Sequence, residues 1–102
     1  MFYTQQLAKF LSSLEATKDA DGNSILHNSM IVYGSGNADG NRHTHSNLPI
    51  VLAGKGGGSL SSGRRVNYNG KPLTNLYLTL GERMGVDALD SFGDSTGPLK
   101  DV

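Results

Sequence analysis

The feature that most constrains the fold is the run LPIVLA at residues 48–53, which is apolar at every position. A strand with one solvated face alternates apolar and polar residues, whereas a continuous apolar run is typical of a parallel strand covered on both faces. Pro49 lacks a backbone N–H and is expected at the start of that strand. The sequence therefore predicts a central strand near residues 48–53.

A second β-prone run lies upstream, where β-branched and aromatic residues are followed by Gly34. It predicts a strand near residues 29–34, parallel to the one at 48–53. Residues 60–68 have the composition of one or two short edge strands. Together these runs predict a short, partly parallel sheet.

Apolar residues at three- and four-residue spacing predict helices over about residues 2–18 and 72–84. Pro72 suits the first turn of the second helix, and Gly85 supplies its exit. From residue 87 onward the sequence predicts an irregular tail. The expected fold class is α/β, a small layered module with two main helices.

A chain of 102 residues is long enough for one domain, so residues 1–102 are expected to form a single module. Two convincing strands are fewer than a doubly covered sheet normally has. Either a second subunit completes the sheet, in which case the chain is a homo-oligomer and a homodimer in the simplest case, or the chain is a piece of a larger protein.

Composition excludes several function classes. Lys and Arg total 9 and Asp and Glu total 9, so no basic field attracts nucleic acid or a membrane surface. No apolar run is long enough to span a bilayer. Without cysteine the chain has neither a thiolate nucleophile nor a redox clue to its compartment, and its localisation stays open.

The segment richest in chemistry is DGNRHTHSN at residues 39–47, between the two predicted strands. Alternate residues of an extended segment point the same way, so His43 and His45 can face one ion, with Asp39 as an oxygen ligand. Such ligands suit a divalent metal such as zinc, manganese or calcium. The alternative is a solvated loop whose histidines bond to backbone or water.

Glycine-rich stretches at 34–36 and 54–58 invite a phosphate-binding interpretation, but neither fits the spacing of a nucleotide-binding loop. No nucleotide is therefore expected as a cofactor. Residues 19–23 resemble the opening of a calcium loop but lack its spacing, and they predict a plain turn. His27 precedes a strand and is interpreted as a structural or exposed residue.

Several motifs together resemble the C-terminal portion of the bacterial HXXSHH-motif family, although the motif that names the family lies upstream of the matching region. The motifs are SMIVYGSG (29–36), DGNRH (39–43), NLPIVLAG (47–54), PLTNLYL (72–78), MGV (84–86) and SFGDSTGPL (91–99). That family is remotely similar to the alkaline phosphatase and sulfatase superfamily, whose members hydrolyse phosphate or sulfate esters with two metal ions. The resemblance implies that His43 or His45 corresponds to a late ligand histidine and that the nucleophile lies outside this chain.

Two functional hypotheses follow. The leading one is a metal-dependent hydrolase-like module that acts on a small-molecule ester of the phosphate, sulfate or lactone type. Its metal, held by Asp39, His43 and His45, activates a water, and Arg42 or Arg64 stabilises the developing negative charge. The alternative is a non-catalytic structural or interaction fragment that oligomerises and carries a vestigial histidine loop. Whether the chain is an enzyme is left open by the sequence.

Overall fold

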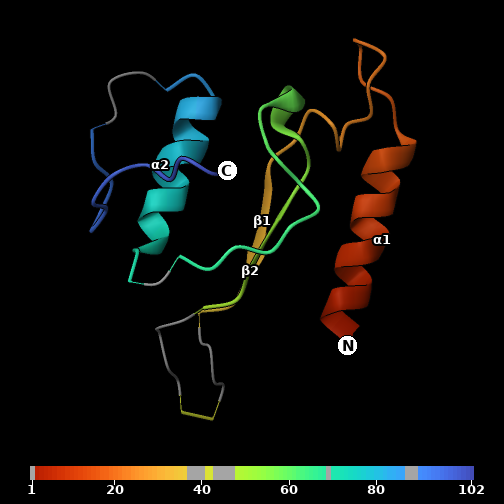
Figure 1. The fold of residues 1–102 in the computed structure, drawn as a ribbon. Coiled ribbons are helices and arrows are strands. Elements are labelled where there is room, and N and C mark those ends of the chain that lie inside the picture. Colours follow the sequence, from red (N-terminus) through yellow and green to blue (C-terminus); the bar gives the residue numbers. More distant parts are fainter. Residues whose placement is uncertain (1, 37–40, 43–47, 69, 87–89) are drawn as a thin grey trace. The chain divides into compact units, whose positions relative to one another are not determined.

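The computed structural model describes residues 2–36, 41–42, 48–68, 70–86 and 90–102. The chain divides into two compact units, Met1–Ser62 and Gly63–Val102, and each is described by itself. The elements are, in order, α1 (Phe2–Ala16), β1 (Ile31–Gly34), β2 (Ile50–Ala53), the short 3-10 helix η1 (Gly56–Gly58) and α2 (Leu73–Arg83) (Figure 1). The chain is thus a small α/β protein with two helices, whereas the single module over residues 1–102 stays a prediction.

The two strands form an antiparallel sheet in which Ile31 pairs with Ala53 and Gly34 pairs with Ile50. The predicted parallel arrangement of these strands is therefore wrong. Parallel strands need a crossover connection that is usually helical, and residues 35–49 carry no apolar stripe for such a helix. Within this single chain β2 is not covered on both faces, because Val51 is 48% exposed. β2 does begin directly after Pro49, as predicted.

The first helix ends close to the predicted boundary because later residues satisfy its last carbonyls. The final carbonyl groups of a helix have no partner within it. The Thr17 hydroxyl donates to the Ser13 carbonyl at 2.8 Å, and the Leu26 N–H donates to the Leu14 carbonyl at 3.3 Å. The Ile25 N–H donates to the Thr17 carbonyl at 2.9 Å. These bonds attach the segment after α1 to the end of the helix, and the predicted turn at residues 19–23 lies between.

The glycine-rich segment after β2 packs against the backbone that precedes β1. The N–H groups of Gly56 and Gly57 donate to the carbonyls of Ser29 and His27, each at 2.9 Å. Gly54 has a φ of +96°, and a Cβ there would collide with the backbone of Ser29. Only glycine provides both the positive φ and the close approach.

The second unit consists of α2 and the segments around it. Pro72 lies just before the helix with φ −63°, and Gly85 follows it with φ +86°. The Gly85 N–H donates to the Glu82 carbonyl, and the Val86 N–H donates to the Gly81 carbonyl. This pair of bonds is the Schellman ending of a helix. The predicted helix over residues 72–84 is thus confirmed, together with its stop signal.

The chain from residue 90 onward has no helix or strand, as predicted, yet polar side chains of α2 hold it. The Asn75 side chain exchanges two hydrogen bonds with Thr96, and the Thr79 hydroxyl bonds both backbone groups of Leu99. Asn75, Thr79 and Leu99 are all buried. The predicted strands at residues 60–68 are wrong, because the positions described there form none.

Candidate functional site

The predicted metal ligands Asp39, His43 and His45 lie outside the described residues, so their metal site stays a prediction. Arg42 is described and exposed, and it belongs to the first compact unit. Arg64 is also exposed but belongs to the second unit. Within the described part of the chain, no group of three or more His, Cys, Asp or Glu side chains is placed to hold a metal ion.

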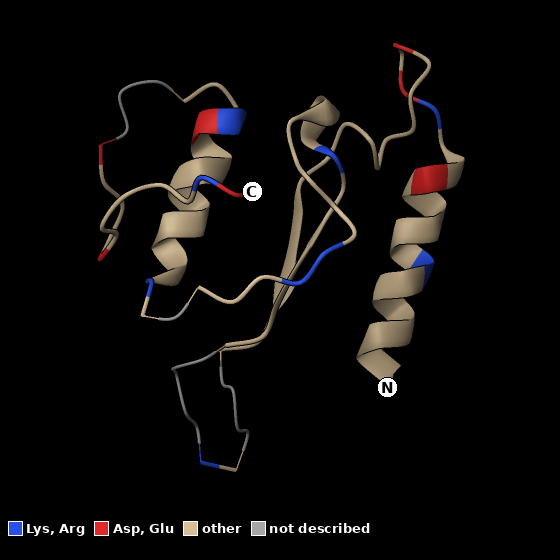
Figure 2. Cartoon of the chain, in the orientation of Figure 1, with Lys and Arg blue, Asp and Glu red and all other residues tan. Residues whose placement is uncertain are grey.

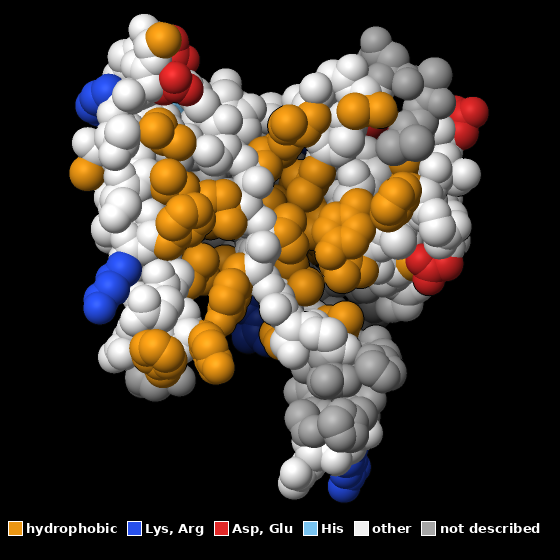
Figure 3. Space-filling view, turned by 180° about the vertical axis from the view of Figure 1, so that it is seen from behind, with side chains coloured by type: hydrophobic (Ala, Val, Ile, Leu, Met, Phe, Trp, Pro, Cys, Tyr) orange, Lys and Arg blue, Asp and Glu red, His pale blue; other side chains and the backbone are white. Residues whose placement is uncertain are grey.

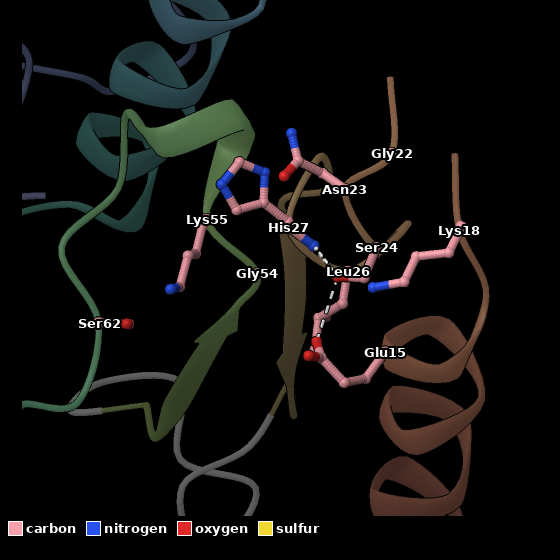
Figure 4. Close-up of a pocket in the computed structure, with 10 residues that line it drawn as sticks. All are labelled: Glu15, Lys18, Gly22, Asn23, Ser24, Leu26, His27, Gly54, Lys55 and Ser62. Carbon is pink, nitrogen blue, oxygen red and sulfur yellow. Dashed lines mark hydrogen bonds between the residues drawn. The ribbon is translucent and has the colours of Figure 1, made fainter. Parts of the chain in front are cut away.

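The pocket in the first unit lies where the end of α1, the segment before β1 and the segment after β2 meet. Its volume is about 430 Å³. Figure 4 shows its lining residues, which are Glu15, Lys18, Gly22, Asn23, Ser24, Leu26, His27, Gly54, Lys55 and Ser62. We call this pocket the His27 pocket, because His27 is the histidine among its described lining residues.

Ser24 builds one wall of the His27 pocket. Its hydroxyl donates to a Glu15 carboxylate oxygen at 3.2 Å and accepts the backbone N–H of His27 at 3.0 Å (Figure 4). Ser24 is 6% exposed, and both bonds are partly buried. Ser24 therefore caps the turn that carries His27, as serine does at the start of a helical turn, and anchors that turn to α1.

The Asn28 side chain, which is itself held by Asp19 and Asp21, orients the His27 ring through a hydrogen bond to Nδ1. The Asn28 amide nitrogen donates to Asp19 at 3.1 Å and to Asp21 at 3.0 Å, which uses both of its protons. Asn28 must therefore present its oxygen to His27 Nδ1, 2.9 Å away. An amide oxygen only accepts, so Nδ1 carries the proton and Nε2 of the neutral ring is left as an acceptor.

The carboxylate of Asp21 is held in its charged form. The backbone N–H of Asn23 and then the Asn28 amide lower the pKa of Asp21 below its ordinary value of 3.8. Hydrogen bonds to a carboxylate favour its ionised form. Asp21 is thus charged at neutral pH and keeps the Asn28 amide in the orientation that the hydrogen bond to His27 requires.

Charged groups of both signs lie in and beside the pocket, because Asp19 and Asp21 bond to Asn28 next to His27. Lys18 follows α1 and Lys55 follows β2, while Glu15 supplies the carboxylate among the described lining residues. That carboxylate already accepts the hydroxyl proton of Ser24. Among the described residues, the two lysines are therefore matched by the carboxylates of Glu15, Asp19 and Asp21.

The glycine-rich segment at 54–58 does not cradle an anion through Gly56 and Gly57. Their N–H groups, like that of Gly58, already donate hydrogen bonds to backbone carbonyls of the protein. A phosphate cradle needs such N–H groups free to point at the ligand. The contribution of this segment to the pocket is instead the side chain of Lys55.

Sequence reasoning missed the His27 pocket. It treated His27 as an isolated residue and residues 19–23 as a plain turn, although the two are joined through Asn28. The available signal was the dipeptide His27-Asn28 closely after two aspartates. Its interpretation requires the chain to fold back at Gly22, which the sequence predicts as a turn without specifying the partner.

Comparisons with family models, with curated proteins and with solved structures find no match to this chain. The resemblance to the HXXSHH-motif family therefore stays a prediction. Among the helices that are described, none has the length and apolar character needed to cross a membrane.

Proposed function

We propose that this chain is a non-catalytic interaction module that associates with a second copy of itself through α1. The observation that carries the proposal is the exposure of this helix. α1 has 15 residues, and none of them is buried. Its aromatic side chains Phe2, Tyr3 and Phe10 are 62%, 74% and 52% exposed.

The composition of α1 also favours a covered helix. Lys9 and Glu15 are its charged residues, and the others are apolar or neutral polar (Figure 2). Figure 3 shows hydrophobic side chains at many places on one face of the molecule, and the large exposed ones of α1 are Phe2, Tyr3 and Phe10. A helix that stays in water normally has a charged outer face, and exposed aromatic side chains gathered on one element mark interaction sites.

The proposed occupant of this surface is a second copy of the chain. The formal net charge is zero, so two copies do not repel each other at long range. An apolar stripe on a helix is self-complementary and suits a two-fold interface. The sheet adds a second reason, because a two-stranded sheet is marginal alone and leaves one edge of each strand unpaired in the described part. We propose that association also completes the sheet.

The test replaces one aromatic side chain of α1. Phe10→Gln is expected to shift the protein toward monomer in sedimentation equilibrium, because about half of this ring is exposed and available to a partner. Ser12→Gln introduces the same residue on the opposite side of the helix and is expected to leave the oligomer intact. A wild type that remains monomeric at high protein concentration, or equal effects of the two substitutions, would overturn the proposal.

A second candidate is the metal-dependent ester hydrolase, with Asp39, His43 and His45 as ligands. The pairing of Gly34 with Ile50 supports it, because residues 35–49, which include the three ligands, connect these two paired positions. A bound metal would lower the pKa of its water, and Arg42 is the nearby cation for the developing charge.

Elemental mass spectrometry tests this second candidate. Near-stoichiometric metal in the wild type, lost in a folded His43→Ala/His45→Ala variant, is the expected result for a hydrolase. Absence of metal after incubation with zinc, manganese and calcium would exclude this candidate. The outcome does not affect the oligomer test, which uses a different element.

A further inference from the structure

We infer that the second unit carries a further surface through which two copies of the chain associate. This surface is formed by Tyr77 and Met84 of α2 and by Phe92 of the C-terminal segment, and we call it the Tyr77 surface. Its occupant is the same surface of a second copy. The inference rests on the proposed self-association and adds to it a contact outside α1.

The helix α2 carries more apolar side chains than its own unit covers. Leu76 and Leu78 are buried. A second apolar set recurs at spacings of four, three and four residues, which places it along one stripe of the helix: Leu73, Tyr77, Leu80 and Met84. In this stripe Tyr77 is 38% and Met84 72% exposed. A stripe with this spacing is the seam along which two helices pair.

The ring of Phe92 is held beside this stripe although Phe92 is 50% exposed. The ring centroids of Tyr77 and Phe92 lie 6.4 Å apart in an edge-to-face arrangement. The Phe92 N–H donates to the Ser95 hydroxyl at 2.8 Å, and the Phe92 carbonyl accepts the Ser95 N–H at 3.0 Å. The Thr74 hydroxyl donates to Asp94 at 2.7 Å and attaches this turn to α2. An aromatic side chain that is fixed before association loses little conformational entropy when a partner covers it.

The area that a stable dimer buries argues for this further contact. A standard interface buries about 800 Å² on each partner. An aromatic side chain contributes roughly 150–250 Å² when fully buried, so the exposed parts of Phe2, Tyr3 and Phe10 offer roughly 400 Å². The exposed parts of the Tyr77 surface add roughly 300 Å². The aromatic side chains of α1 are therefore too small an area alone, whereas the two surfaces together approach the area required.

The chemistry of the Tyr77 surface matches a second copy of itself. It combines aromatic rings with the flexible thioether of Met84, and methionine sulfur makes favourable contacts with aromatic rings. In a two-fold interface each contact occurs twice, so Met84 of either copy can pack on Tyr77 of the other. None of the three side chains is charged, so pairing the surface with its own copy brings no like charges together. These properties favour a second copy as the occupant.

Sedimentation equilibrium of the full chain tests the inference with matched variants. Met84→Gln is expected to weaken the dimer by about tenfold or more, because each copy loses roughly one buried apolar side chain. Met84 is 72% exposed, so the fold of the single chain should survive, and circular dichroism checks this. Glu82→Gln places the same residue on the other side of α2 and is expected to leave the dimer unchanged. Equal effects of the two substitutions would overturn the inference.

The variant Phe10→Gln separates this inference from the proposed function. A dimer that is lost in Phe10→Gln but kept in Met84→Gln would overturn the Tyr77 surface and leave association through α1 standing. The reverse result would support the Tyr77 surface and overturn the role of α1. A wild type that is monomeric at high protein concentration would overturn both.

Isotope-filtered NMR on a mixture of labelled and unlabelled chains tests the contact itself. Seven residues of helix rise about 10 Å, so Tyr77 and Met84 of one copy are too far apart for a direct nuclear Overhauser effect. A cross-peak between the Met84 methyl group and the Tyr77 ring is therefore expected only between copies. A dimer that lacks this cross-peak would contradict the inference.

Discussion

At the scale of single residues, the glycine at position 54 illustrates how backbone conformation and close packing combine. Gly54 and Gly58 both have φ +96°, but only Gly54 lies against other backbone, that of Ser29 and Leu26. Gly58 has open space where a Cβ would be added. The two positions therefore separate the cost of positive φ from the cost of collision.

Gly54→Ala is expected to lower the free energy of unfolding by about 3 kcal/mol or more, because both conformational strain and backbone collision act. Gly58→Ala should cost about 1 kcal/mol, the strain alone. Urea unfolding followed by circular dichroism measures both. Equal losses in the two variants would mean that the contact of Gly54 with Ser29 is absent in solution.

Asp21 makes stability depend on pH in a defined direction. A carboxyl group whose folded pKa is lowered adds stability above its unfolded pKa of 3.8 and loses it as pH falls through the folded value. The wild type should therefore lose more stability between about pH 5 and pH 2.5 than Asp21→Asn, which cannot titrate. Denaturant unfolding at several pH values measures this, with Asp101→Asn at an exposed position as control. Parallel pH profiles for wild type and Asp21→Asn would refute the assignment.

At the scale of elements, α2 is the best-anchored helix because buried polar side chains tie the C-terminal segment to it. Thr79 is 1% exposed, and its hydroxyl accepts the Leu99 N–H at 2.7 Å and lies 3.0 Å from the Leu99 carbonyl. Thr74 makes a comparable bond to Asp94, but in an exposed position. Burial should therefore separate the two threonines.

Thr79→Val is expected to lower the free energy of unfolding by about 2 kcal/mol, because it leaves the buried N–H and carbonyl of Leu99 without their hydrogen-bond partner. Thr74→Val should cost about 0.5 kcal/mol, because water replaces its lost bond. Hydrogen exchange at the Leu99 amide, together with thermal unfolding, measures the difference. Unchanged protection of that amide in Thr79→Val would show that the anchor is unimportant.

At the scale of the whole molecule, stability is distributed over two small units whose described apolar cores hold few side chains. The buried hydrophobic residues are Leu60 in the first unit and Leu76, Leu78 and Leu99 in the second. Small cores are marginal and often depend on association. The exposed aromatic side chains of α1 are part of the apolar area that a second copy can cover, and Tyr77, Met84 and Phe92 in the second unit are exposed as well.

If association supplies the missing burial, thermal stability depends on protein concentration. A tenfold increase in concentration should raise Tm by roughly 3–5 °C for a dimer of this size. Differential scanning calorimetry over two decades of concentration measures the shift, and Phe10→Gln should abolish it. A Tm that is independent of concentration would argue for a self-sufficient monomer.

The sequence by itself determined the local structure of this protein. The spacing of Leu7, Leu11 and Leu14 determines α1, and the stop at Gly85 requires only contacts within a few residues. The start of β2 follows in the same way from Pro49, which cannot donate a ladder hydrogen bond. Each of these features depends on forces that act within one or two turns of chain.

Only the tertiary structure decided how these pieces meet. The apolar run at 48–53 fits a strand in either direction, and the pairing of Gly34 with Ile50 makes it antiparallel. The His27 pocket likewise depends on Gly54 lying against Ser29, a contact between segments far apart in sequence. Periodicity and composition describe which face of an element is apolar, whereas pairing direction and site assembly depend on long-range contacts that they do not encode.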